Sequence, residues 1–315
     1  IVSDAGLKLL PACLLPACRR GARRSRRAVH SRTDVLSRSM SSSSSAPTAI
    51  ITGGSGDIGA AVAEMLAGSG WNVVINYSQS QEKAEAVAAV CRAHCAERDN
   101  ARTVQGSVAE DGDCRRIAQL AMEAFGRIDA LVNNAGATKF CAHDDLEGLS
   151  AEDFQSLYAI NTVGPFQVTR ACVPHMAAGS SVVNVSSVAG KAGTGSSIAY
   201  VASKGALNSL TLSLARALGP KGIRVNAVCP SVIEGEWMRR GMGEERFGAY
   251  FDEFRMLAPM RQTIRPADVA EAIVPLLTSN AKVTGQLLTV DAGQQLNVLS
   301  LPAGVQASAK NGAAQ

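Results

Sequence analysis

The chain has 315 residues, of which 46% are hydrophobic and 18% are charged, a composition typical of a soluble globular α/β domain. No apolar run approaches the roughly 18 residues that cross a bilayer, so we expect no membrane partner. The formal net charge of +4 is uneven: residues 1–39 hold nine Lys or Arg against two Asp, and the rest is mildly acidic. A nucleic-acid partner is therefore not expected.

Residues 1–45 are predicted to form a disordered leader or transit-like segment, because they contain CRRGARRSRR and run into MSSSSS. An Arg-rich, Ser-rich, acid-poor segment resembles an organelle transit peptide, and translation upstream of a start at Met40 explains it equally well. Eight scattered cysteines suit reduced thiols. We expect an intracellular protein, cytoplasmic if translation starts at Met40 and organellar if residues 1–39 are a transit peptide.

From Ala46 onward, short apolar strands alternate with segments of helical periodicity. Strands are predicted at 49–52, 72–76, 101–105, 130–133, 181–185, 223–229 and 287–290. Helices are predicted at 58–66, 81–97, 111–125, 154–176, 200–218 and 267–277, the fourth interrupted at Gly164 and Pro165. This alternation predicts an α/β fold with a doubly wound parallel sheet (Rossmann fold), as a single domain over 46–297 with a flexible tail over 298–315.

Two stretches are candidate sites for a bound group. The turn between the first predicted strand and helix carries Gly53, Gly54, Gly56 and Gly59. These glycines would let the backbone approach a pyrophosphate, whose charge the amino end of the helix would meet. The second stretch holds Cys91, His94 and Cys95, but no further ligand pair follows at zinc spacing. We therefore predict a dinucleotide site and no metal site.

The residues best suited to chemistry are Ser187, at the end of a predicted strand, and Tyr200 and Lys204 on the following helix. Tyr200 and Lys204 are four residues apart, so their side chains rise from one helix face. A nearby ammonium would lower the phenol pKa from roughly 10. Ser187 would donate to a carbonyl oxygen that Tyr200 protonates, which suits alcohol–carbonyl interconversion. Taken alone, the same spacing also occurs in ordinary surface pairs.

Several motifs in one order resemble the short-chain dehydrogenase/reductase family over residues 47–296. They are TGGSGDIG from Thr52, NNAG from Asn133, INTVGPF around Asn161, Ser187, Tyr200-x-x-x-Lys204, RVNAVCP ending at Pro230, and VTGQLLTVDAG. The pattern is most similar to the 3-oxoacyl-carrier-protein reductase branch. The resemblance implies an NAD(P)(H)-dependent oxidoreductase that interconverts a ketone and a secondary alcohol, with 3-oxoacyl-type compounds as candidate substrates.

The resemblance also implies a role for each catalytic residue. Tyr200 would be the acid/base, Lys204 would lower its pKa and hold the ribose hydroxyls, and Ser187 would polarise the substrate oxygen. Asn161 would support a proton relay through water; alternatively, Asn161 caps backbone groups in a helix. A different class of function also stays open, a catalytically weak nucleotide-binding sensor or scaffold on the same fold.

The cofactor site implied by the resemblance comprises Gly53, Ser55, Gly56, Asp57, Ile58, Gly59, Asn76, Tyr77, Ser78, Ser107, Val108, Asn134, Ala135, Gly136, Tyr200, Lys204, Pro230, Val232 and Ile233. NADP(H) is favoured and NAD(H) is the alternative, because the second strand ends in INYSQS without the carboxylate that would repel a 2′-phosphate. Asp57 departs from the small residue usual in the family. Its carboxylate would either cap the first helix or repel a phosphate.

The segment 232–260 interleaves apolar and charged residues. By resemblance it is a lid over a small carbonyl or alcohol substrate, with Trp237, Met238, Met242, Phe247, Tyr250, Phe251, Phe254 and Met256 as its apolar residues. The alternative is a pair of amphipathic helices packed on the core. Relatives also imply a homotetramer or homodimer, assembled through the helices around 151–178 and 200–218.

Overall fold

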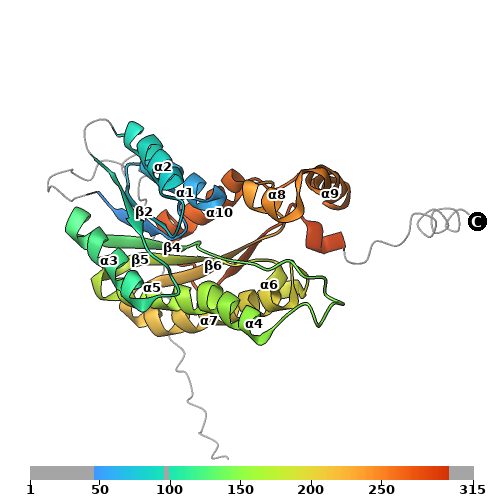
Figure 1. Cartoon of the computed structure of the whole chain (residues 1–315). Helices are drawn as coiled ribbons and strands as arrows, with labels where there is room; N and C mark the ends of the chain where they lie inside the picture. Colours follow the sequence, from blue (N-terminus) through green and yellow to red (C-terminus); the bar gives the residue numbers. More distant parts are fainter. Residues whose placement is uncertain (1–45, 96–98, 298–315) are drawn as a thin grey trace, which may run out of the picture. The chain divides into compact units, whose positions relative to one another are not determined.

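The computed structural model describes residues 46–95 and 99–297, so the predicted leader (1–45) and tail (298–315) lie outside the described residues. Seven parallel strands form one sheet in the order β3-β2-β1-β4-β5-β6-β7 (Figure 1). The strands are β1 (Thr48–Ile51), β2 (Asn72–Tyr77), β3 (Ala101–Gln105), β4 (Ile128–Asn133), β5 (Met176–Val185), β6 (Arg224–Pro230) and β7 (Leu287–Val290). The predicted α/β fold, a doubly wound parallel sheet in a single domain, is confirmed.

Helices cover both faces of the sheet (Figure 1). One face carries α1 (Asp57–Gly68), α2 (Gln81–Ala93) and α10 (Pro266–Thr278), and the other carries α3 (Asp111–Phe125), α5 (Gly164–Cys172) and α7 (Ile198–Leu218). Successive strand residues point to opposite faces, so the fully buried Ile50 and Ile51 enter different apolar clusters, Ile51 beside α1 and Ile50 beside α3. Burial on both faces explains why the strands are almost continuously apolar.

The strand order reverses at β1. From β1 the chain adds β2 and β3 on one side, then crosses to β4 on the other side and continues outward to β7. Parallel sheets of this kind bind ligands beyond the carboxyl ends of the strands at such a reversal. The glycine turn after β1, the NNAG stretch after β4 and Ser187 after β5 therefore meet at one edge.

The predicted helix 154–176 divides into several elements. It comprises α4 (Ala151–Tyr158), a π-helical turn (Ala159–Val163), α5 and a 3-10 turn (Val173–His175), and β5 starts directly at Met176. Ser150 caps α4 with its hydroxyl, and Asp153 completes a capping box. Asn161 lies in the π-helical turn, which widens the helix locally and is common at functional sites.

The carboxyl-terminal part of the fold supplies the remaining helical elements. They are α6 (Ala189–Ala192), a 3-10 turn (Gly219–Lys221), α8 (Glu236–Met242), α9 (Glu244–Leu257) and a 3-10 turn (Gln294–Asn297). Both α8 and α9 fall inside the segment predicted to be a lid. Within residues 46–95 and 99–297, no helix combines the length and apolar character needed to cross a bilayer.

Candidate active site

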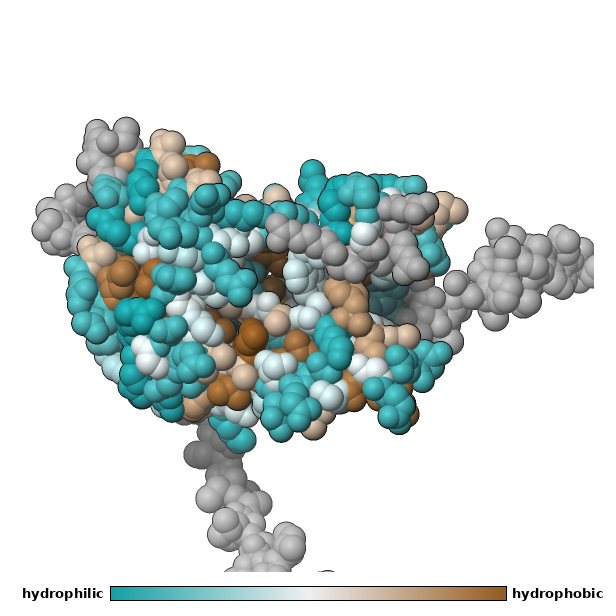
Figure 2. Space-filling model, viewed as in Figure 1, coloured by the Kyte–Doolittle hydropathy of each residue, from teal (hydrophilic) through white to brown (hydrophobic). Residues whose placement is uncertain are grey.

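A cleft of about 960 Å³ opens at the carboxyl ends of β1, β4, β5 and β6. Figure 2 shows this side of the protein, with apolar side chains gathered in the central hollow. The predicted residues that line the cleft are Gly53, Ser55, Gly56, Asp57, Ile58, Asn134, Ala135, Gly136, Ser187, Tyr200, Lys204, Pro230, Val232 and Ile233. Most of the predicted set is therefore brought together around one cavity.

The glycine turn is tied to the end of β4 by side-chain bonds. Gly53 has φ +59°, a conformation that favours glycine. The Asn134 amide donates to the carbonyls of Thr52 (3.0 Å) and Gly53 (2.9 Å), and the Thr52 hydroxyl accepts from the backbone of Asn134 and Ala135. A Cβ at Gly59 would stand 2.5 Å from the Gly53 carbonyl oxygen, so Gly59 lets α1 pack onto this turn. This role of Thr52 in holding the turn to β4 was not predicted.

The amino end of α1 carries no side-chain cap, because its N-cap residue is Gly56. The first amides of a helix lack partners within the helix, and an anion satisfies them well. A dinucleotide pyrophosphate therefore fits this turn. Asp57 does not cap α1; its Oδ2 instead accepts the backbone N–H of Trp237 at 3.2 Å. The predicted capping role of Asp57 is therefore wrong.

Seven of the residues predicted to bind cofactor or to take part in catalysis do not line the cleft. They are Gly59, Asn76, Tyr77, Ser78, Ser107, Val108 and Asn161. Asn76 is buried, and its amide donates to the carbonyls of Val104 (3.2 Å) and Gly106 (3.0 Å) while its oxygen accepts from Gly53. This side chain joins the glycine turn to the neighbouring strand β3. A role for Asn76 in binding the ribose stays a prediction.

Tyr200 enters the cleft from the first turn of α7, which Ser197 caps by accepting the Tyr200 N–H. The phenol is buried, and burial raises its pKa to about 12, although a hydrogen bond with the Ser187 side chain acts in the opposite direction. The predicted lowering of this pKa by Lys204 does not appear. Removal of the phenol from water outweighs the hydrogen bond with Ser187, and the Lys204 amine lies 5.8 Å from the ring centroid.

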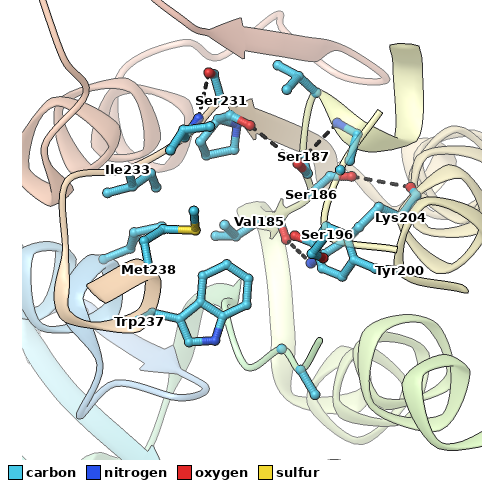
Figure 3. Close-up of a pocket in the computed structure, with 18 of the residues that line it drawn as sticks. Val185, Ser186, Ser187, Ser196, Tyr200, Lys204, Ser231, Ile233, Trp237 and Met238 are labelled. Atoms are coloured by element: carbon cyan, nitrogen blue, oxygen red, sulfur yellow. Dashed lines mark hydrogen bonds between the residues drawn. The ribbon is translucent and has the colours of Figure 1, made fainter. Parts of the chain in front are cut away.

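Lys204 lies one turn further along α7, as its spacing predicts, and its side chain reaches the same cavity (Figure 3). Its Nζ donates to the Val185 carbonyl at 2.9 Å. The residue is only 4% exposed, and this burial lowers the pKa of the amine to about 8. The amine is thus poised to change its protonation state just above neutral pH.

Ser187 and its neighbour Ser186, which follow β5, have different environments. The Ser186 hydroxyl is buried and donates to Asn208 Oδ1 at 2.7 Å, a structural bond between β5 and α7. The Ser187 hydroxyl accepts from the Ala189 N–H at 3.1 Å and lies at the cleft wall near Tyr200 (Figure 3). Ser187 is therefore the serine placed to contact a bound carbonyl group.

Asn161 is fully buried behind the cleft. Its Oδ1 accepts from the Ala137 N–H at 2.8 Å, and its Nδ2 donates to the Ala137 carbonyl at 2.9 Å and to the Ser203 hydroxyl at 3.0 Å. The side chain thus caps backbone groups, although they belong to the loop after β4 rather than to its own helix. It holds that loop against α7, and its part in a proton relay stays a prediction.

A buried polar chain supports the strands beneath the site. Asn133 donates to Asn184 Oδ1 at 2.9 Å, and Asn184 donates in turn to the Thr211 hydroxyl at 2.9 Å. These bonds join β4, β5 and α7. Asn133 belongs to the NNAG motif that carries the family resemblance, whereas Asn184 and Thr211 were not predicted to take part in the site. The asparagine at register position 184, directly opposite Asn133, was the available signal.

Two loops that the sequence analysis did not include form the outer wall of the cleft. They contribute Phe140, Cys141, Ala142, His143, Thr194, Gly195 and Ser196. The loops are joined by hydrogen bonds from the Cys141 N–H to the Ser196 carbonyl (2.9 Å) and between His143 Nε2 and the Gly195 carbonyl (3.1 Å). Their positions just after β4 and just before α7 were the signal that could have identified them.

The segment 232–260 contributes both to the cleft lining and to packing in the core, and its role as a lid stays a prediction. Trp237, Met238 and Tyr250 line the cleft, and the Trp237 ring centroid lies 6.3 Å from that of Tyr200 (Figure 3). In contrast, Phe251 and Phe254 are buried in packing contacts, and Phe251 lies against Phe247. Met256 is largely exposed, and the side chain of Met242 lies outside the described residues.

The arrangement agrees with known proteins along most of the described chain. A family profile described as "Enoyl-(Acyl carrier protein) reductase" matches residues 54–295. A Streptomyces violaceoruber protein, named as ketoacyl reductase 2 of the granaticin polyketide synthase, is 41% identical over 253 residues, covering 80% of this chain and 97% of that protein. The chain belongs to the short-chain dehydrogenase/reductase family.

Crystal structures of other short-chain dehydrogenases/reductases support this assignment. A Burkholderia xenovorans protein is 38% identical with a TM-score of 0.73, covering 80% of this chain and 99% of that chain. A Burkholderia cenocepacia protein in complex with NADP is 31% identical with a TM-score of 0.70, covering 79% and 98%. The resemblance to this family and to its ketoacyl reductases is confirmed.

Proposed function

We propose that this short-chain dehydrogenase/reductase is an NADP(H)-preferring enzyme that interconverts a ketone and a secondary alcohol. One observation carries the proposal: the Tyr200 phenol and the Ser187 hydroxyl share one cleft wall, and the same cleft reaches the uncapped amino end of α1. Acid/base groups and a place for a dinucleotide therefore face one cavity. The side chains of Phe140, Trp237 and Met238 also line this cavity and give part of its wall an apolar surface.

In the reducing direction, a bound reduced nicotinamide would supply the hydride to the carbonyl carbon. Ser187 holds the carbonyl oxygen by donating a hydrogen bond, and Tyr200 gives its phenolic proton to that oxygen as the alcohol forms. The raised phenol pKa keeps Tyr200 protonated before the reaction, as a proton donor must be. Lys204, buried beside it, would hold the ribose hydroxyls of the bound nucleotide.

The preference for NADP(H) over NAD(H) is proposed from the end of β2. Asn76, Tyr77 and Ser78 carry no carboxylate that would repel a 2′-phosphate. Asn76 and Tyr77 are buried, and Ser78 is exposed. The exposed Ser80 and Lys83 begin α2 directly beyond and would donate to the phosphate. The NADP complex of the Burkholderia cenocepacia relative supports the same choice.

The likeness to a ketoacyl reductase supports 3-oxoacyl-type compounds as candidate substrates. We also propose a homotetramer or homodimer assembled through α4, α5 and α7. These elements, with the π-helical turn between α4 and α5, leave large apolar side chains 39–47% exposed: Phe154, Tyr158, Val163, Phe166 and Leu212. An intracellular location is proposed from the free thiols of the described cysteines, with the compartment set by residues 1–39.

The proposal is tested by mixing the full chain with a panel of 3-oxoacyl esters and simple ketones and following oxidation of NADPH or NADH by absorbance. We expect turnover on at least one ketone and a higher kcat/KM with NADPH. Nucleotide binding with no turnover on any carbonyl or alcohol would instead support the sensor or scaffold, which the carboxylate of Asp57 in the glycine turn favours.

A further inference from the structure

Asp57 occupies the glycine turn yet contacts a segment 180 residues away. It is the first residue of α1, and its Oδ2 accepts the backbone N–H of Trp237, the second residue of α8. A hydrogen bond to a carboxylate is stronger than one between neutral groups. The turn where a nucleotide would bind is thus directly bonded to the segment that carries Trp237 into the cleft.

Gly235, directly before α8, lies close against the Asp57 carboxylate. A Cβ added at Gly235 would collide with Asp57 Oδ2 and lie 3.1 Å from its Cγ. Gly235 has φ −149°, an extended conformation open to any residue, so space rather than backbone conformation requires glycine here. A side chain at position 235 would displace the Asp57 carboxylate from its present position beside α8.

A second tie joins the same two regions at the surface. Lys83, in the first turn of α2, forms an ion pair with Glu236 at 2.7 Å, and both side chains are nearly half exposed. Solvent screens such a pair strongly, so it contributes little on its own. The Asp57 contact joins the beginning of α8 to the nucleotide side of the cleft through a half-buried carboxylate, beside this exposed ion pair.

We propose that Asp57 is a positioning residue: its carboxylate anchors the start of α8 to the glycine turn and so fixes Trp237 beside Tyr200. The contact also turns the charge of Asp57 toward α8 and away from the uncapped amides of α1. A phosphate at those amides and an anchored α8 are then compatible. If the anchor is lost, the freed carboxylate opposes the phosphate.

The anchor is tested first without nucleotide. The chain has two tryptophans, so a Trp71→Phe background makes the emission report on Trp237 alone. In that background we compare Asp57→Ala, Asp57→Asn and Gly235→Ala, with Asp144→Ala, an exposed carboxylate outside the cleft lining, as the matched control. Hydrogen exchange at the amides of residues 236–242 is measured on the same proteins.

We expect Asp57→Ala and Gly235→Ala to red-shift the Trp237 emission and to speed exchange at residues 236–242 by about tenfold or more. Asp57→Asn keeps an acceptor oxygen and should change both readouts less, and Asp144→Ala should change neither. Wild-type emission and exchange in Asp57→Ala, or equal changes in Asp57→Asn and Asp57→Ala, would overturn the anchor. Gly235→Ala breaks the contact from the opposite side should Asp57→Ala fail to fold.

The second arm rests on the proposed function and titrates NADPH into the same variants. Gly235→Ala should weaken NADPH binding about five- to tenfold, because the freed carboxylate faces the phosphates. Adding Asp57→Asn to Gly235→Ala should restore the wild-type affinity, since the charge is gone. No recovery would contradict the charge argument. Failure of the wild type to bind NADPH would count against the proposed function, while the emission and exchange data still decide the anchor.

Discussion

The two walls of the cleft are held in different ways. The wall built from β4, β5 and α7 consists of buried groups whose polar atoms bond to one another, such as Asn161 to the Ala137 backbone and Lys204 to the Val185 carbonyl. The wall formed by α8 is joined to the glycine turn and α2 by solvent-facing contacts, among them the backbone bond to Asp57 and the exposed Lys83–Glu236 ion pair. From this comparison we expect the first wall to fix the geometry for chemistry and the second to affect substrate access.

The largest effect on stability is expected in the wall built from β4, β5 and α7. Asn161→Ala removes one buried and two partly buried hydrogen bonds and takes their partner from the half-buried Ala137 backbone groups. We expect the free energy of unfolding to fall by about 3 kcal/mol, because buried polar groups without partners are costly. Chemical denaturation checks this value. A decrease of less than about 0.5 kcal/mol in the free energy of unfolding would show that the loop after β4 does not depend on Asn161.

A buried amine gives the same wall a distinctive dependence on pH. Burial lowers the pKa of Lys204 from 10.5 to about 8, so the folded state binds fewer protons than the unfolded state between these values. The free energy of unfolding should therefore rise with pH across this window. We expect the free energy of unfolding of the wild type, taken relative to that of Lys204→Met, to rise by about 2 kcal/mol from pH 7 to pH 10. A constant difference in denaturation curves would show that the lysine is hydrated.

The α8 wall should respond differently, with function affected more than stability. The Trp237 side chain is 46% exposed but lies beside Tyr200. We expect Trp237→Ala to raise the KM for the carbonyl substrate about five- to tenfold while the kcat and the melting temperature change little. Steady-state kinetics and thermal melts measure these effects. A large drop in melting temperature would place Trp237 in the core instead.

The smallest effect is expected at the surface ion pair. Lys83→Met should change the free energy of unfolding by less than about 0.5 kcal/mol, because both Lys83 and Glu236 are nearly half exposed. If Lys83 also contacts the 2′-phosphate, the same variant should lose affinity for NADPH while its affinity for NADH stays unchanged. Equal losses for the two nucleotides would remove Lys83 from the choice of cofactor.

Much of the fold could be predicted because local patterns and the family motifs point the same way. The alternating apolar strands and helices gave the parallel sheet, and the four-residue spacing of Tyr200 and Lys204 placed both side chains in one cleft. The π-helical turn around Asn161 was not predicted. The side chain of Asn161 bonds to a loop 24 residues earlier in the chain. Sequence periodicity does not reveal such contacts.

The predicted pKa of Tyr200 was wrong for a related reason. Spacing along a helix shows that an amine is near the phenol, but it does not show how completely both groups are removed from water. The partner of Asp57 was likewise hidden, since the contact joins the first helix to a segment near the end of the domain. Burial and long-range contacts are properties of the folded chain.

The most direct measurement of the central claim compares the wild type with Tyr200→Phe in two assays, NADPH binding and ketone reduction. The substitution removes only the phenolic oxygen from a buried ring, so NADPH affinity should stay within about twofold of wild type. The kcat should fall by about 10²- to 10⁴-fold, the range typical for loss of a general acid. Wild-type turnover by Tyr200→Phe would contradict the assignment of proton transfer to Tyr200.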